Sequence, residues 1–305
     1  MRLRYQVDRL ERSERLDPLV RALDAFWRRA LPGNGRARDA LHGTWLGHPL
    51  HPALTDVPIG AWASALLLDV TAGDRAAGPS QALVGAGLLA AVPTAITGAT
   101  DWTALGTTER PRRVGAVHAV ANGTATVLYA ASWLARRRGR HATGRALGYA
   151  GAALMGAGGY LGGHLAYRNA VGVDRTADET QVGEWTEVCL LRDLPMRVPV
   201  RRRVGEADVL LYRIGSTVRA IAATCSHLGG PLEEGHVQED CVTCPWHGST
   251  FDLTDGSVVR GPATAPQPAY EVRVVGRTVS VRRERRPARE AVRDEDAVTL
   301  ADRAR

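Results

Sequence analysis

The stretches Cys225-Ser226-His227 and Cys244-Pro245-Trp246-His247 decide how the C-terminal third of this chain must fold. Each joins a cysteine to a histidine, and sixteen residues separate them, so thiol and imidazole groups alternate along the chain. A Cys2His2 zinc site uses the same two ligand types, but common zinc spacings keep the cysteines together and the histidines together. The alternation instead favours two loops that each supply one sulfur and one nitrogen ligand.

The residues that flank the two stretches are rich in turn-forming types. Leu228-Gly229-Gly230-Pro231-Leu232 follows the first, Gly248-Ser249-Thr250-Phe251-Asp252 follows the second, and a turn-rich loop starts at Gly261-Pro262. With these flanks, residues 184–283 resemble a Rieske domain, whose [2Fe–2S] cluster has two cysteines on one iron and two histidines on the other. The resemblance implies that the cluster ligands are Cys225, His227, Cys244 and His247.

The resemblance also implies a ferredoxin-like subtype. Rieske proteins of respiratory complexes join their cluster loops by a disulfide, and Gly230 and Trp246 occupy the positions of those two cysteines here. We therefore expect no disulfide between the cluster loops. The remaining Cys189 and Cys241 are expected to be small buried thiols.

Two positions bear on the reduction potential of such a cluster. Ser249 matches the family position whose hydroxyl hydrogen-bonds a cluster sulfur, whereas Phe251 stands where high-potential members have a tyrosine. Hydrogen bonds to sulfur stabilise the reduced, more negative cluster. We therefore expect a potential below the top of the Rieske range, which runs from about −150 to +300 mV.

Composition limits the partners. All 39 basic residues are arginine and they are spread through both halves of the chain, as in a high-GC bacterial genome. The net charge of +7 is thus weak evidence for a polyanion, and no nucleic-acid partner is expected. The N-terminal stretch is too charged for a secretory signal peptide.

The middle of the chain is apolar. Four segments carry few or no charges: about Val57–Ala72, Ser80–Thr100, Val114–Ala135 and Ala146–Tyr167. Most approach the 20 or so residues that a bilayer helix requires. The alternative, a soluble alanine-rich bundle, needs a polar stripe on each helix, and Val114–Ala135 has almost none. We predict an N-terminal four-helix transmembrane bundle followed by a small antiparallel β Rieske domain, in the bacterial cell membrane.

These patterns divide the chain. Hydrophobic residues between Leu16 and Leu31 recur with a helical period, which predicts an amphipathic helix, either on the membrane surface or packed on the bundle. Without a signal peptide, both termini and the Rieske domain are expected in the cytoplasm. The expected units are a polar N-terminal segment at 1–40, a four-span membrane domain at 41–173, a linker at 174–183, the Rieske domain at 184–283 and a disordered tail at 284–305.

A second set of polar residues borders the apolar segments. The motifs Gly47-His48-Pro49-Leu50-His51-Pro52, Asp101-Trp102 and Gly162-Gly163-His164 resemble a four-span bacterial membrane domain of uncharacterised function, over about Leu41 to Val173. Ionisable residues inside a span usually face a site or cavity. A haem b or a quinone headgroup is one hypothesis, and hydrogen bonds to neighbouring helices are the other. The four histidines concerned are His48, His51, His118 and His164.

The other histidines, His42, His141 and His236, are expected to be ordinary surface residues. The leading functional hypothesis is a membrane-anchored one-electron transfer protein that works with redox partner proteins or quinone. A redox sensor and the electron-donating component of a separate oxygenase or oxidoreductase system are the alternatives. An autonomous oxygenase needs a 2-His-1-carboxylate iron site, and no histidine follows Arg283, so no substrate-turnover site of its own is expected.

Overall fold

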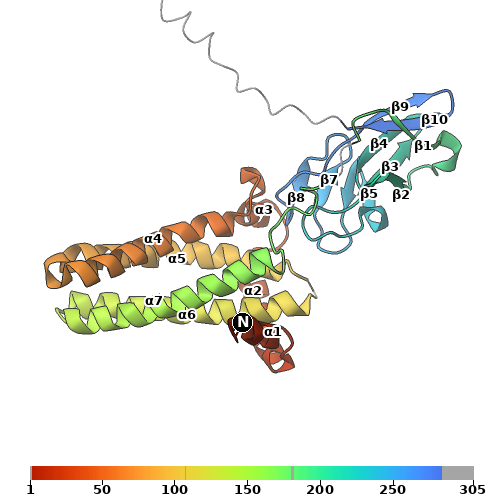
Figure 1. Ribbon diagram of the computed structural model, residues 1–305. Coiled ribbons are helices and arrows are strands. Elements are labelled where there is room, and N and C mark those ends of the chain that lie inside the picture. The colour runs from red at the N-terminus through yellow and green to blue at the C-terminus, as the bar shows by residue number, and fades with distance from the viewer. Residues whose placement is uncertain (1, 107, 180–181, 284–305) are drawn as a thin grey trace, which may run out of the picture.

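The computed structural model describes residues 2–106, 108–179 and 182–283. A helical part, up to residue 167, and a β part, from residue 182, stand end to end (Figure 1). The predicted disordered tail at 284–305 lies outside the described residues.

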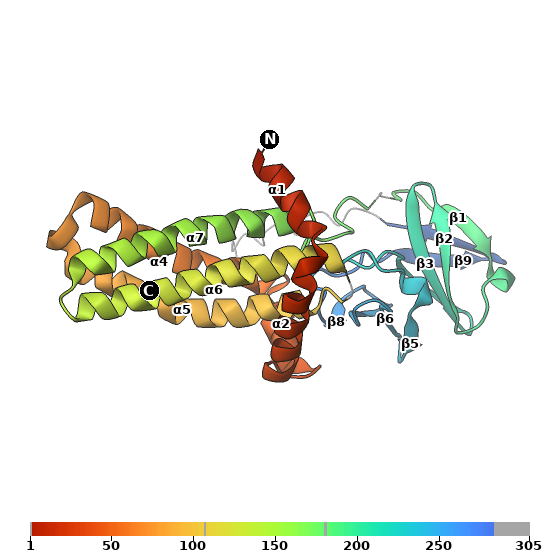
Figure 2. The same cartoon turned by 90° about the horizontal axis from the view of Figure 1, so that it is seen from below.

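Four long helices lie side by side in the helical part and contain the four predicted apolar segments (Figures 1 and 2). Among the described residues, two stretches are long and apolar enough to cross a membrane, Leu50–Thr71 and Gly73–Thr103. Arginines at both ends of the third helix lower its hydropathy. The helices are α4 (Leu50–Thr71), α5 (Ala77–Thr103), α6 (Glu109–Arg137) and α7 (His141–Tyr167).

Aromatic rings and glycines bring these helices close together. A Cβ added at Gly87 would stand 2.2 Å from Nε1 of Trp62, so the indole of α4 lies directly on α5. Trp62 in turn stacks on Tyr129 of α6, with ring centroids 4.1 Å apart. Small residues allow this close approach of neighbouring helices.

Three shorter helices precede the bundle: α1 (Arg2–Glu11), α2 (Asp17–Ala30) and α3 (Arg36–His42). The predicted amphipathic helix is α2, and it crosses the bundle at the end nearest the β part (Figure 2). Arg113 of α6 donates to both carboxylate oxygens of Asp17, at 2.7 and 2.9 Å. The structure thus shows α2 in contact with the bundle, and its place at the membrane surface stays a prediction.

The β part consists of three antiparallel sheets. The first has the strand order β1-β10-β9, the second β2-β3-β4, and the third β5-β6-β7-β8. The strands are β1 (Thr186–Leu190), β2 (Pro199–Val204), β3 (Ala207–Ile214), β4 (Thr217–Ala222), β5 (His236–Gln238), β6 (Cys241–Thr243), β7 (Thr250–Asp252), β8 (Val258–Arg260), β9 (Glu271–Val275) and β10 (Thr278–Arg282).

Strand β3 connects the two hydrophobic cores of the β part. Val209 and Leu211 join the core under the first two sheets, whereas Leu210 joins the core that contains Cys225 and Cys244. Successive side chains of a strand point to opposite faces, so one strand serves both cores. The predicted order of a helical part followed by a small antiparallel β domain is confirmed.

Candidate metal centre

The two Cys-His loops have the same backbone geometry. In the first loop Gly229 N donates to Cys225 O at 2.9 Å, and in the second Gly248 N donates to Cys244 O at 3.1 Å. The φ angles of these glycines are +79° and +80°, in the left-handed region that glycine adopts at little cost. Two equivalent turns therefore present two equivalent Cys-His pairs to each other.

The two cysteines lie at the centre of this arrangement. Cys225 is 1% exposed and Cys244 is 2% exposed. The close approach of the two thiols raises the pKa of Cys225 and lowers that of Cys244 to about 6. Backbone N–H groups of the following residues also point at each sulfur. Such donors stabilise a thiolate, the form that binds metals.

The two histidines, one from each cluster loop, lie beside each other. The ring centroids of His227 and His247 are 5.1 Å apart. Burial is the main cause that lowers the pKa of His227 to about 3, so its imidazole is neutral near pH 7 and has a lone pair to donate. Its Nδ1 atom is buried and has no hydrogen-bond partner among the described residues. A buried polar atom without a partner is costly, and coordination of a metal would satisfy it.

These features fit a [2Fe–2S] cluster. Within the described ranges, no three His, Cys, Asp or Glu side chains are grouped so that they could hold one metal ion. A Rieske cluster requires only two protein ligands at each iron, with both sulfurs at one iron and both nitrogens at the other. Two adjoining thiols next to two adjoining imidazoles meet that requirement.

The neighbouring residues support the ferredoxin-like subtype. A Cβ added at Gly230 would stand 2.7 Å from the Cys244 sulfur, so this position has no room for a side chain unless its surroundings shift. Ser249 is fully buried, and its Oγ accepts a hydrogen bond from Ala263 N at 3.0 Å, which leaves the hydroxyl proton to donate elsewhere. Cys189 and Cys241 are free and only partly buried, so the prediction that both are buried was wrong.

Comparisons with known proteins agree with this site. Residues 184–281 match the Rieske [2Fe-2S] domain, and residues 47–175 match a predicted membrane protein family, DUF2231. Ferredoxin CarAc of Metapseudomonas resinovorans is 35% identical over 91 residues, which cover 30% of this chain and 85% of that protein. The anthranilate 1,2-dioxygenase ferredoxin subunit of Burkholderia cepacia is 31% identical over 103 residues, 34% of this chain and 95% of that one.

Among solved structures, the ferredoxin of carbazole 1,9a-dioxygenase from Nocardioides aromaticivorans IC177 is 31% identical. It covers 33% of this chain and 100% of its own, with a TM-score of 0.32. The chain belongs to the Rieske [2Fe–2S] proteins, and its helical part carries a domain of the predicted membrane protein family. As a Rieske protein it carries a [2Fe–2S] cluster and functions in electron transfer.

The four histidines of the predicted haem or quinone site do not lie together. His51 and His118 lie together, with ring centroids 6.4 Å apart, and their Nδ1 atoms hydrogen-bond the backbone carbonyls of Thr94 and Gly158 at 2.9 and 2.8 Å. His164 is bonded elsewhere, because its Nε2 lies 2.8 Å from Oε1 of Glu11. His48 is exposed.

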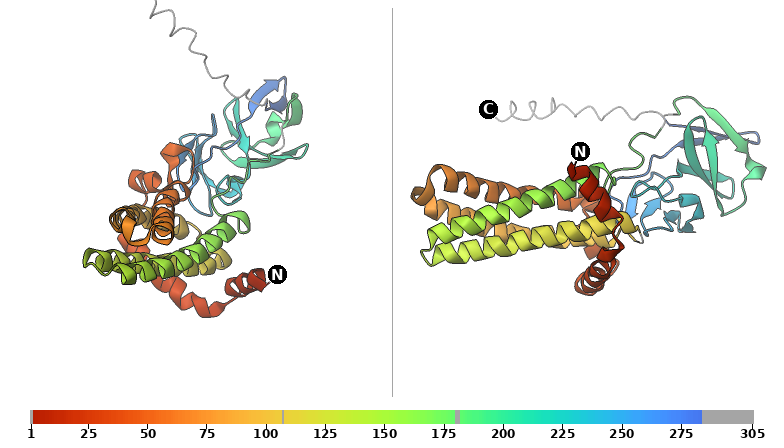
Figure 3. Two further views of the ribbon diagram at one scale, coloured as in Figure 1. Left: turned by 60° about the vertical axis from the view of Figure 1, so that its left-hand side comes forward. Right: turned by 60° about the horizontal axis from the view of Figure 1, so that its bottom comes forward.

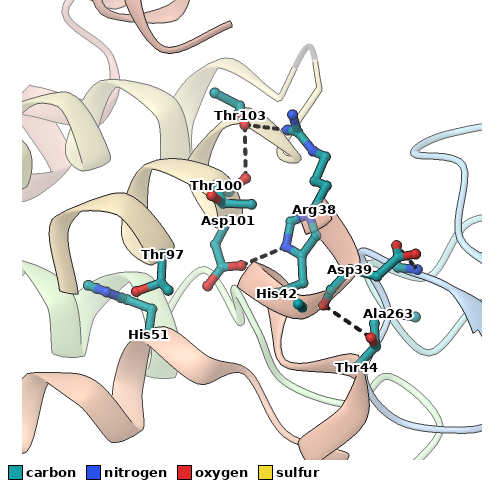
Figure 4. Close-up of polar contacts among 12 residues, drawn as sticks. Arg38, Asp39, His42, Thr44, His51, Thr97, Thr100, Asp101, Thr103 and Ala263 are labelled. Atoms are coloured by element: carbon teal, nitrogen blue, oxygen red, sulfur yellow. Dashed lines mark hydrogen bonds and ion pairs between the residues drawn. The ribbon is translucent and has the colours of Figure 1, made fainter. Parts of the chain in front are cut away.

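His42 differs most from the sequence prediction. It is 2% exposed, and its Nδ1 lies 2.8 Å from Oδ1 of Asp101 at the end of α5 (Figure 4). The prediction of an ordinary surface residue was therefore wrong for His42, whereas His236 is exposed and His141 is partly buried. The Asp101-Trp102 motif was the available signal, but the sequence did not show that α3 packs against it.

Proposed function

We propose that this chain is a membrane-anchored one-electron carrier whose cluster is held by Cys225 and Cys244 at one iron and by His227 and His247 at the other. The supporting observation is the pair of equivalent loops with two buried sulfurs and an unpartnered buried ring nitrogen. When bound, the cluster supplies reversible one-electron chemistry. The protein residues position it, exclude water from its sulfur side and, through Ser249, donate a hydrogen bond that favours its reduced state.

The proposal includes four membrane-spanning helices. Large apolar side chains are exposed on the outer faces of α6 and α7 as well as on those of α4 and α5. Contiguous exposed apolar surface of this kind is typical of a membrane contact. The exposed side chains include Val57, Leu67, Val70, Leu89, Val92, Val120, Val127, Tyr149 and Tyr160.

We further propose that the Rieske domain lies on the cytoplasmic side and that its acceptor is a separate oxygenase or oxidoreductase. Support for the acceptor comes from the relatives that are ferredoxin subunits of dioxygenases. A membrane quinol is the proposed donor. Because His51 and His118 are the two of the four histidines whose rings lie together, a haem b would have to be held by this pair. An optical spectrum of the reduced, purified protein without a haem band would exclude the haem b hypothesis.

Continuous electron flow separates a carrier from the alternative, a redox sensor. The experiment supplies a short-chain quinol as donor and cytochrome c as a soluble acceptor to the full-length protein in lipid nanodiscs. A carrier sustains many turnovers per cluster, and His247→Ala, which removes one proposed ligand, abolishes the flow. A cluster that is reduced once, with no continuing flow to the acceptor, contradicts carriage and favours the sensor.

A further inference from the structure

The tip of the β part that carries both cluster loops contacts the end of the helical part (Figures 1 and 3). One backbone N–H group bridges the two parts, and a second ties the first cluster loop to the segment that connects them. Gly261 N donates to Oδ1 of Asp39 in α3 at 3.0 Å. Arg175 N, in the segment after α7, donates to the carbonyl oxygen of Ser226 in the first cluster loop at 2.9 Å.

His247 is covered by the turn between α5 and α6. A Cβ added at Gly106 in this turn would stand 2.9 Å from both Cδ2 and Nε2 of His247. The backbone of Leu105 also lies beside the His247 ring. The edge of this imidazole therefore lies against the protein rather than in open water.

The loop that starts at Gly261 rests on α3 and the short 3-10 helix after it, Thr44–Leu46. A Cβ at Gly261 would lie 3.1 Å from Cγ2 of Thr44 and 3.4 Å from Cδ2 of His42. His42 is held in place by its bond to Asp101, which ties α3 to the end of α5 (Figure 4). A surface formed by α3 and the short helix after it thus lies under this loop. We call Asp39, His42, Thr44, Leu105 and Gly106 the seat.

We propose that the seat is an interaction surface for the cluster-bearing tip of the same chain, and that it covers the histidine edge of the cluster. A bulky soluble redox partner then reaches that edge only after the tip has lifted from the seat. This inference rests on the proposed function, because it takes His227 and His247 as cluster ligands. In each exchange one electron passes from the reduced cluster to the oxidant, and no covalent bond in the chain forms or breaks.

The character of the contacts explains how the tip can lift. The bridges identified are single polar bonds at the ends of loops, and Arg260 adds only a long pairing with Asp39, at 3.7 Å. Interdomain contacts of this polar kind resemble transient interfaces, for which relative motion is the default. The observed rate of exchange with a bulky partner is then reduced by the fraction of time that the tip spends on the seat.

A disulfide between residues 44 and 261 tests the proposal. The sulfur of Thr44→Cys can take the place of Cγ2, 3.1 Å from the Cβ of Gly261→Cys. In a disulfide, the Cβ of one cysteine lies about 3 Å from the sulfur of the other. The full-length double variant is oxidised, its cross-link is verified by mass spectrometry, and its cluster is quantified by paramagnetic resonance. The rate at which cytochrome c oxidises the dithionite-reduced cluster is then measured by stopped flow.

We expect the cross-linked protein to keep its cluster and to react at about one tenth of the wild-type rate or below. The rate should be restored after the disulfide is opened and the reductant removed. The same double variant with its disulfide open serves as the matched control, because it carries both substitutions and lacks only the cross-link. An intact cluster with an unchanged rate in the cross-linked protein overturns the proposal. So does a failure of the two cysteines to pair in protein that holds its cluster.

A second variant loosens the seat instead of locking it. Asp39→Ala removes the acceptor of the Gly261 N–H bond, and we expect faster oxidation by cytochrome c. Asp74→Ala, which removes the partner of Arg145 at the far end of the bundle, is the matched control. An Asp39→Ala rate equal to that of wild type counts against the seat. Wild-type protein without a cluster refutes the ligand assignment itself, and that result is distinct from every outcome above.

Discussion

Replacement of Ser249 by alanine should lower the reduction potential of the cluster by about 40–90 mV. The hydroxyl is fully buried and accepts from Ala263 N, so its own proton is available to the cluster. A hydrogen bond adds about 1 kcal/mol of stability when its acceptor is neutral and about 1.5–3 kcal/mol when the acceptor is charged. The bond therefore stabilises the reduced cluster over the oxidised one by about 1–2 kcal/mol, and for one electron 59 mV corresponds to about 1.4 kcal/mol.

The assay is a potentiometric titration of the full-length protein followed by paramagnetic resonance. Ser226→Ala is the matched control, because Ser226 is a buried hydroxyl of the other cluster loop whose proton is already donated to Ala265 O at 2.8 Å. We expect the control to shift the potential by much less. A Ser249→Ala potential equal to that of wild type, or equal shifts in both variants, would refute the assigned role of Ser249.

Three further predictions concern stability and cluster assembly. Arg136→Met leaves the buried carboxylate of Asp69 without the guanidinium that now lies 2.9 Å away. Thermal unfolding of the detergent-purified protein should show a loss of stability of about 3–5 kcal/mol. A loss below about 1 kcal/mol would contradict this. Gly248→Ala places a side chain at φ +80°, which costs about 1–2 kcal/mol, and should lower the iron content per chain, whereas an unchanged content speaks against the loop geometry. Burial raises the pKa of Glu11, but hydrogen bonds from His164 and Asn169 outweigh it, so the pKa lies below its ordinary value of 4.5. The stability that the Glu11 carboxylate adds should therefore be lost as the pH falls through and below 4.5. The melting temperatures of wild type and Glu11→Gln should therefore converge in acid. A difference between them that grows in acid would contradict the prediction.

Features that depend on local sequence were predictable. The Cys-His loops are short, and each turn is fixed by residues within six positions of its cysteine, such as Gly229 and Gly248. The long apolar runs likewise predicted the four bundle helices. The sequence predicted that α6 crosses a membrane, but arginines at both of its ends lower its hydropathy, and only the stretches of α4 and α5 are apolar enough among the described residues.

Contacts between distant residues were not predictable. His164 bonds Glu11 across 153 positions, and Gly261 bonds Asp39 across 222. His42 looked like a surface residue because nothing nearby in the sequence indicated that Asp101 would lie beside it. Neither hydrophobic periodicity nor motif spacing carries information of this kind, since it depends on how whole helices and loops dock.

Pulsed paramagnetic resonance of the anaerobically purified, dithionite-reduced full-length protein tests the central claim most directly. We predict couplings from two histidine nitrogens to the reduced cluster. Chemical analysis of the same protein should give two iron atoms and two acid-labile sulfide ions per chain. His227→Ala and His247→Ala should each abolish the nitrogen couplings, whereas His236→Ala, at an exposed histidine of β5, should keep them. Colourless protein that contains zinc, or a cluster without nitrogen couplings, would contradict the assignment of these four ligands.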